Sequence, residues 1–286
     1  MNLLLRISCC VLFSASLGSC SAYKKNAKAD DPRPGAAATT GAPVKTVANK
    51  AYRTPTLQGP APRNPDVNLS AGFSAGAGVT HSRGPADKPF VAITFDDGPN
   101  PQNTPRLLDM LRQRNIKATF YVIGRNVEMY PEIVRRTVAE GHEIGNHTFS
   151  HRLLTKMGDS EVLRELSRTR DAISAAAGVQ PRTMRPPYGG LLQRQRELVH
   201  NQFGYPTVLW SVDPRDWQRP GTSVVASRIV TGASNGSIIL AHDLHGPTVD
   251  AMPAALDGLL RKGYRFVTVS QMIALQEAAT LAAAQT

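Results

Sequence analysis

Short apolar segments alternate with longer amphipathic segments from residue 90 onward. Runs of β-branched and aromatic residues bounded by turn residues predict buried strands, and apolar residues that recur every three or four positions predict helices. Strands are expected at 90–95, 118–123, 142–144, 183–184, 206–210, 237–240 and 266–267. Helices are expected to begin near residues 104, 131, 159, 195, 223, 252 and 270. About seven strands that alternate with helices imply an α/β fold with a parallel sheet, either open or closed.

Every unusual polar cluster directly follows one of these predicted strands. The clusters are Asp96–Asp97, His147–His151, Arg185–Tyr188, Asp213–Trp217 and His242. In β/α barrels the loops at the carboxyl ends of the strands open on one face, where active sites lie. We therefore expect the five clusters to converge, which favours a barrel-like enzyme over a binding module.

The first 19 residues have the features of an export signal. Arg6 precedes an apolar stretch, Ile7 to Leu17, that is too short to span a bilayer. The sequence Leu17-Gly18-Ser19-Cys20 resembles the bacterial lipoprotein cleavage box. We therefore expect residues 1–19 to be removed and Cys20 to be lipidated, which would anchor the exported protein to a membrane of the bacterial cell envelope, facing the periplasm or the outside. An ordinary signal peptide whose cleavage site includes a cysteine is the alternative.

Residues 20–86 differ in composition from the rest of the chain. They are rich in Pro, Ala, Gly and Thr and show no helical or strand periodicity, so they are expected to be a disordered linker. This span carries most of the net charge of +11, so the charge does not indicate a nucleic-acid partner. Cys9 and Cys10 lie in the signal, which leaves no pair for an internal disulfide. Residues 87–286 are expected to form a monomeric catalytic domain.

Two histidines four residues apart, His147 and His151, have a spacing that suits one metal ion. Asp97 as a third ligand would complete a site of two histidines and one carboxylate with open positions. Such a ligand set fits hydrolytic zinc and equally fits a non-haem iron oxygenase. Two surface histidines without a metal are the plainer alternative.

Three further residues have the chemistry that a hydrolase needs. Asp96, next to a predicted ligand, is a candidate general base. Arg185 can pair with Asp96 and keep its carboxylate ionised. Tyr188 lies in a rigid Pro-Pro-Tyr-Gly turn, whose backbone amide can bind an oxyanion.

His242 is the candidate general acid because it directly follows an apolar predicted strand, as the other polar clusters do. A buried structural histidine is the alternative for His242, and His245 is a competing acid. Asp213 and Asp216 are each able to orient an imidazole or to occupy a turn. Trp217 fits the core and the pocket wall equally well.

Five segments, taken in order, resemble the motifs of the NodB-like polysaccharide deacetylases, carbohydrate esterase family four. They are Thr94-Phe-Asp-Asp-Gly-Pro, His147-Thr-Phe-Ser-His, Arg185-Pro-Pro-Tyr, Asp213-Pro-Arg-Asp-Trp and Leu240-Ala-His. The resemblance covers residues from about 88 to 275 and no motif position is substituted. It implies a distorted β/α barrel of about seven strands and metal-dependent removal of N-acetyl groups from a hexosamine polymer.

The resemblance also implies a role for each matched residue. Asp97, His147 and His151 would bind the metal; Asp96 would be the base, steadied by Arg185; the Tyr188 amide would bind the oxyanion; His242 would be the acid, tuned by Asp216; and Trp217 and Leu240 would line the acetyl pocket. The metal is expected to be Zn²⁺, with Co²⁺, Ni²⁺ or Mn²⁺ as alternatives. The expected substrate is peptidoglycan or a chitin-like or poly-N-acetylglucosamine polymer. An iron oxygenase and an inactive carbohydrate-binding lipoprotein are the competing functions.

Overall fold

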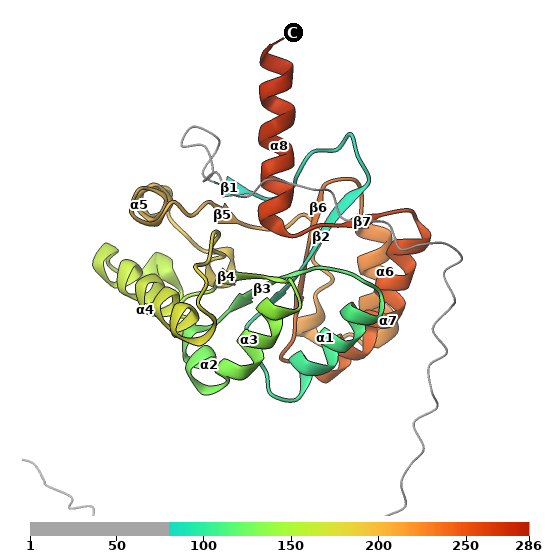
Figure 1. The fold of residues 1–286 in the computed structure, drawn as a ribbon, viewed down its shortest axis with the longest axis horizontal. Helices are drawn as coiled ribbons and strands as arrows, with labels where there is room; N and C mark the ends of the chain where they lie inside the picture. The colour runs from blue at the N-terminus through green and yellow to red at the C-terminus, as the bar shows by residue number, and fades with distance from the viewer. Residues whose placement is uncertain (1–79, 286) are drawn as a thin grey trace, which may run out of the picture. The chain divides into compact units, whose positions relative to one another are not determined.

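The structure, a computed structural model, describes residues 80–285 (Figure 1). The predicted signal, Cys20 and residues 20–79 of the predicted linker lie outside them. The strands are β1 Thr80–His81, β2 Phe90–Asp96, β3 Thr119–Val122, β4 Glu143–Asn146, β5 Thr207–Val208, β6 Ser237–His242 and β7 Arg265–Phe266. The helices are α1 Asn103–Gln113, α2 Gly124–Met129, α3 Pro131–Ala139, α4 Asp159–Ala177, α5 Gln193–Phe203, α6 Thr222–Gly232, α7 Gly246–Arg261 and α8 Val269–Ala284.

All strand ladders in this part of the chain are parallel. One sheet has the order β4-β3-β2-β6, with β7 also paired to β2, and a second ladder joins β1 to β5. Isolated bridges through Met184 connect β4 to β5, and a bridge from Val212 reaches β6. The predicted parallel α/β fold is thus confirmed. Closure into a distorted barrel stays a prediction.

Strand β2 is the centre of the sheet, and all seven of its residues are buried. A strand covered on both faces needs apolar side chains on both, which explains the apolar residues at 90–93 and 95. Ile93 and Phe95 belong to the main core cluster together with Leu107 and Leu111 of α1 and Leu256 of α7. This packing fixes the carboxyl end of β2, where the two aspartates begin.

The observed helices follow the signals in the sequence with two exceptions. Helix α2 was not expected, because six residues are too few to show a helical period. Helix α7 begins at Gly246, earlier than the predicted start near residue 252. Its Gly-Pro start suggests a turn, yet proline is compatible with the first turn of a helix, where its missing N–H is not needed.

The folded domain begins before residue 87, where the sequence placed its start. Strand β1 pairs with β5, and Arg83 forms an isolated bridge with Ser237 and donates a hydrogen bond to Ser234 Oγ. Residues 80–86 therefore contact the domain and are not part of a free linker. A strand of two residues is too short to show the alternation that predicts strands.

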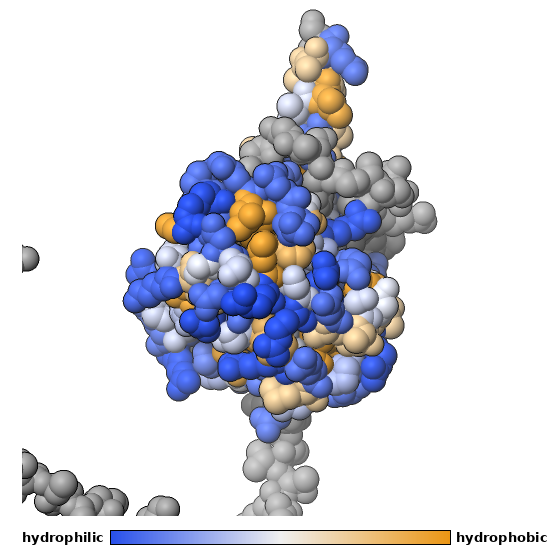
Figure 2. Space-filling view, turned by 90° about the vertical axis from the view of Figure 1, so that its left-hand side faces the viewer, coloured by the Kyte–Doolittle hydropathy of each residue, from blue (hydrophilic) through white to orange (hydrophobic). Residues whose placement is uncertain are grey.

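The outer surface over α4 and α5 is mainly hydrophilic, with a hydrophobic patch among the polar residues (Figure 2). Helix α8 packs its first turns on the domain and then extends away from it (Figure 1). Across residues 80–285, every helix is too short or too polar to cross a membrane.

Candidate active site

The expected clusters converge at the carboxyl ends of β2, β4 and β6. They surround a pocket of about 430 Å³. Its lining residues are Asp96, Asp97, His147, His151, Pro186, Tyr188, Trp210, Asp213, Trp217, Leu240, His242 and His245. Members of all five clusters therefore lie together, although they are spread over much of the chain.

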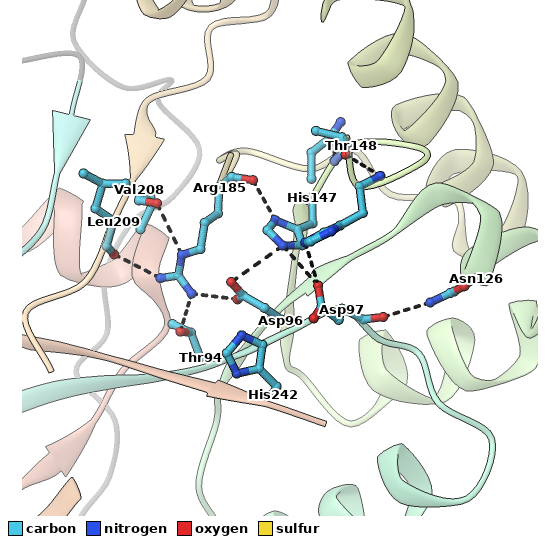
Figure 3. Close-up of polar contacts among 12 residues, drawn as sticks. Thr94, Asp96, Asp97, Asn126, His147, Thr148, Arg185, Val208, Leu209 and His242 are labelled. Carbon is cyan, nitrogen blue, oxygen red and sulfur yellow. Dashed lines mark hydrogen bonds and ion pairs between the residues drawn. The ribbon is translucent and has the colours of Figure 1, made fainter. Parts of the chain in front are cut away.

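Asp97, His147 and His151 form a compact group of potential metal ligands, with one ligand atom from each lying within 4.8 Å of the others. His147 Nε2 is 3.3 Å and His151 Nε2 is 3.1 Å from Asp97 Oδ1. His147 Nδ1 lies 2.7 Å from the Arg185 carbonyl oxygen (Figure 3). A carbonyl only accepts, so Nδ1 carries the proton and the Nε2 lone pair is free to bind a metal.

The group fits a divalent cation. Among the described residues, Asp97 Oδ1 is buried and accepts no well-aligned hydrogen bond. Burial alone would raise the pKa of Asp97, but the facing imidazoles of His147 and His151 lower it below its ordinary value. A buried, ionised carboxylate oxygen that faces two imidazole nitrogens is a donor set that Zn²⁺ and related metals accept.

The backbone of Asp97 is held in place by its neighbours. Its φ of 75° lies in the left-handed region, which is unusual for a residue with a side chain. The Asp97 N–H donates to the Tyr121 carbonyl at 3.2 Å, and the Asn126 side-chain amide donates to the Asp97 carbonyl at 2.8 Å. These contacts from β3 and α2 orient the Asp97 carboxylate toward the two histidines.

Asp96 lies between the histidines and Arg185. Its Oδ1 accepts a hydrogen bond from Arg185 at 2.7 Å, and its Oδ2 is 3.8 Å from His147 Nε2. Arg185 is fully buried and also donates to Thr94 Oγ1 and to the Val208 and Leu209 carbonyls (Figure 3). The guanidinium thus has a fixed position and holds one oxygen of Asp96, while the other faces the predicted metal site.

His242 and Asp216 form the second polar pair of the pocket. Asp216 Oδ1 lies 2.9 Å from His242 Nδ1, and Oδ2 accepts from the His242 N–H at 2.9 Å and from Thr248 Oγ1 at 3.0 Å. Burial would lower the pKa of His242, but Asp216, and more weakly Asp96 and Asp97, raise it to about 9. His242 is therefore protonated at neutral pH.

The remaining predicted residues also lie at the pocket. Tyr188 has a φ of 59°, is 71% exposed as a residue, and packs its ring against His151 with 4.9 Å between centroids. Trp217 is 54% exposed at the rim, and buried Leu240 lines the interior. Asp213 lines the pocket, where its carboxylate accepts the Arg215 N–H at 2.7 Å and thereby closes its own turn.

Sequence reasoning missed residues that support the site. Thr94 lies in the first predicted motif but was given no role, and Thr248 was not identified. Each holds a charged group of the site, and the single hydroxyl of a threonine gives no distinctive signal of such a role. Trp210 lines the pocket and was expected only as the end of a strand. Its position three residues before Asp213 is the signal that could have identified it.

Known proteins resemble this chain in both sequence and structure. The sequence model of the polysaccharide deacetylase family matches residues 83–208. Peptidoglycan-N-acetylglucosamine deacetylase PgdA of Listeria monocytogenes is 39% identical over 182 residues, which cover 64% of this chain and 38% of that protein. A peptidoglycan-N-acetylglucosamine deacetylase of Bacillus cereus is 40% identical over 193 residues, which cover 66% of this chain and 70% of that protein.

A solved structure, that of the Bc1960 peptidoglycan N-acetylglucosamine deacetylase, superimposes with a TM-score of 0.65 at 39% identity. The match covers 68% of this chain and 92% of the solved one. The likeness is therefore to nearly the whole solved domain, whereas it spans well under half the length of the Listeria protein.

Proposed function

Because this chain belongs to the polysaccharide deacetylase family, we propose that it removes N-acetyl groups from an N-acetylhexosamine polysaccharide and releases acetate. The observation that carries the proposal is the arrangement of three units around one pocket. These are the Asp97, His147 and His151 group, the Asp96–Arg185 pair and the His242–Asp216 pair. Together they supply ligands, a base and an acid, which amide hydrolysis requires.

Asp97, His147 and His151 are proposed to hold Zn²⁺, with Co²⁺, Ni²⁺ and Mn²⁺ as alternatives. A bound divalent cation of this kind acidifies a water molecule and polarises a carbonyl oxygen. The protein's part is to fix the three donor atoms and to leave the pocket side open for the acetamide group.

Asp96 is proposed to take the proton of the attacking water. Its Oδ2 faces the metal ligands, while Arg185 holds Oδ1 and orients the carboxylate. The Tyr188 backbone N–H is proposed to donate to the oxygen on which negative charge develops. The left-handed conformation of Tyr188 in its short turn supports this role, because it gives the peptide groups around Tyr188 a different direction from that of an extended strand.

His242 is proposed to protonate the departing amine, with Asp216 tuning it. An amine is a poor leaving group until it is protonated, so the acid must carry a proton at working pH. The raised pKa of His242, about 9, meets this condition. Leu240 and Trp217 are proposed to bound the space for the acetyl methyl group and the sugar ring.

The proposed substrates are peptidoglycan, at its N-acetylglucosamine or N-acetylmuramic acid units, and a chitin-like or poly-N-acetylglucosamine polymer. The names of the relatives support peptidoglycan. We also propose that the protein is exported, lipid-anchored through Cys20 in the cell envelope and monomeric. The lipoprotein-like segment before Cys20 and the cell-wall substrates named for the relatives support this location.

Acetate release by the purified protein from each of these polymers tests the proposal. We expect a strong chelator to abolish release, and Zn²⁺ or Co²⁺ to restore it without a reductant or an oxoacid cosubstrate. Restoration by Fe²⁺ alone, together with oxygen consumption, would refute the hydrolase and favour the oxygenase.

A further inference from the structure

The segment that carries both histidine ligands, residues 147–151, is here called the ligand loop. Two of its residues, Thr148 and His151, have φ values of 65° and 59°. Left-handed backbone is unfavourable for residues with a β-carbon, so the loop keeps this shape only if its surroundings hold it. The separation of the His147 and His151 side chains depends on that shape.

Glu165 of α4 contacts the middle of the ligand loop through both carboxylate oxygens. Its Oε2 accepts the backbone N–H groups of Phe149 at 2.9 Å and Ser150 at 2.7 Å, and its Oε1 accepts from Ser150 Oγ at 2.8 Å. All three hydrogen bonds are made by a charged acceptor, which makes them stronger than bonds between neutral groups. Glu165 thus binds the donors that lie between the two ligands.

The carbonyl groups of the same loop are bound from the other side. The Thr148 and Phe149 carbonyls accept from the N–H groups of Gly124 and Arg125, at 3.0 and 3.2 Å, where α2 begins. The loop backbone is therefore held between the start of α2 and the side chain of Glu165.

Helix α4 is itself fixed against the loop at two further points. The Asn146 side-chain amide donates to the Leu166 carbonyl at 2.9 Å, while its oxygen accepts the Thr148 N–H at 3.0 Å. Arg168 stacks on the Phe149 ring, with 3.5 Å between the guanidinium carbon and the ring centre. Glu165 therefore projects from an element whose position relative to the loop is set by contacts on both sides.

We propose that Glu165 is a positioning residue for the metal site, which sets the separation of His147 and His151 without touching metal or substrate. The inference rests on the metal site of the proposed function. A carboxylate suits the position because it only accepts hydrogen bonds, and all its partners here are donors. A glutamine amide would accept through one atom and oppose a donor with the other.

Zn²⁺ affinity of the purified full chain, measured by competition with a chelator, tests the proposal. Loss of a group that orients a metal ligand typically weakens metal binding about 10- to 100-fold. We expect E165A to show a loss of that size and E165Q a smaller one. The absorption spectrum of the Co²⁺ form should also change in E165A, because the two imidazoles would no longer be held at the same separation.

Glu161→Gln is the matched control. Glu161 lies one turn earlier on α4. Its carboxylate accepts the Gly158 N–H at 3.1 Å and lies 3.7 Å from the exposed guanidinium of Arg152, so neither contact reaches residues 147–151. We expect its Zn²⁺ affinity to equal that of the unmodified protein. A shared loss in E161Q and E165Q would mean that α4 stability, not the Glu165 contacts, controls metal binding, and would overturn the proposal.

Wild-type Zn²⁺ affinity in E165A and E165Q, with a lower unfolding temperature alone, would show that Glu165 only stabilises the fold. If E165A does not fold, E165Q and Ser150→Ala, which removes one of the three hydrogen bonds, decide by the same measurement. Unchanged affinity in both overturns the proposal. His147→Ala tests the metal site separately from the role of Glu165. Unchanged Zn²⁺ affinity in that variant would refute the metal site itself.

Discussion

At the scale of single residues, each charged side chain of the site has a partner that fixes its position and leaves it one chemical role. Arg185 holds one oxygen of Asp96, and Asp216 contacts His242 through both its oxygens, one at the ring Nδ1 and the other at the backbone N–H. Two adjacent aspartates thus have different surroundings: Asp97 faces two imidazoles, whereas Asp96 is bound to a guanidinium. This difference underlies the separate roles proposed for them.

Asp96→Asn should keep the metal and lose most of the turnover. A general base contributes about 10²- to 10⁴-fold to rate, and the asparagine amide cannot accept the proton. His147→Ala, in contrast, should lose metal. Metal content by elemental analysis and acetate release, measured on both variants, check the division of roles. Equal metal loss in both variants would show that Asp96 is also a ligand.

Asp216→Asn should move the alkaline limb of the pH–rate profile to lower pH. The proposed acid acts when protonated, so activity should fall as pH rises through the His242 pKa of about 9. Removing the negative charge of Asp216 lowers that pKa toward the ordinary value, so His242 loses its proton at a lower pH.

Rates of acetate release by the unmodified protein and by the Asp216→Asn variant, from about pH 6 to 10, measure the position of the alkaline limb. His242→Ala should lose far more turnover than His245→Ala. An alkaline limb that does not move in the Asp216 variant would assign it to a group other than His242.

At the scale of elements, the strands determine where the site residues lie. Register pairs Asp96 of β2 with His242 of β6 and Asp96 with Tyr121 of β3. The Tyr121 ring lies beneath Arg185, with 4.3 Å between the guanidinium carbon and the ring centre. Gly145 of β4 faces the same ring, where a β-carbon would be 2.4 Å from it. Close packing between β3 and β4 therefore supports the position of Arg185.

Gly145→Ala should destabilise the fold and reduce turnover. The added methyl group displaces Tyr121, and overpacking of this kind costs about 1–3 kcal/mol. Denaturant unfolding measures the stability. Gly246→Ala is the control, because its β-carbon would meet no atom within 4 Å. Equal stability of the Gly145 variant and the unmodified protein would show that Tyr121 moves aside without cost.

At the scale of the whole molecule, the domain extends to residue 80 through the pairing of β1 with β5 and the contacts of Arg83. The pocket depends on β5 only indirectly, since Arg185 donates to the Val208 and Leu209 carbonyls at the end of this strand. Residues 80–86 are thus expected to contribute to stability and, through β5, to the site.

A chain that begins at residue 80 should keep the activity of the full protein, whereas one that begins at residue 87 should be less stable because β5 loses its partner strand. The thermal unfolding temperature and the rate of acetate release, measured on both truncated chains, test this prediction. Equal stability of the two truncated chains would show that β1 contributes nothing to the stability of the domain.

Cys20→Ala in the full chain should abolish lipidation, detected by mass spectrometry, and leave catalysis intact.

The sequence by itself predicted the alternation of strands and helices, apart from β1 and α2, and most of the residues that line the pocket. Buried strands and amphipathic helices leave local periodic patterns, and motifs such as Thr94 to Pro99 combine rare residues at short spacing. The tertiary structure decided how these residues meet. Only the parallel register brings His242 beside Asp96, the tertiary contact with Asp216 raises the His242 pKa although burial lowers it, and only α4 places Glu165 against the ligand loop. Such contacts join residues that are distant along the chain, so no local pattern records them.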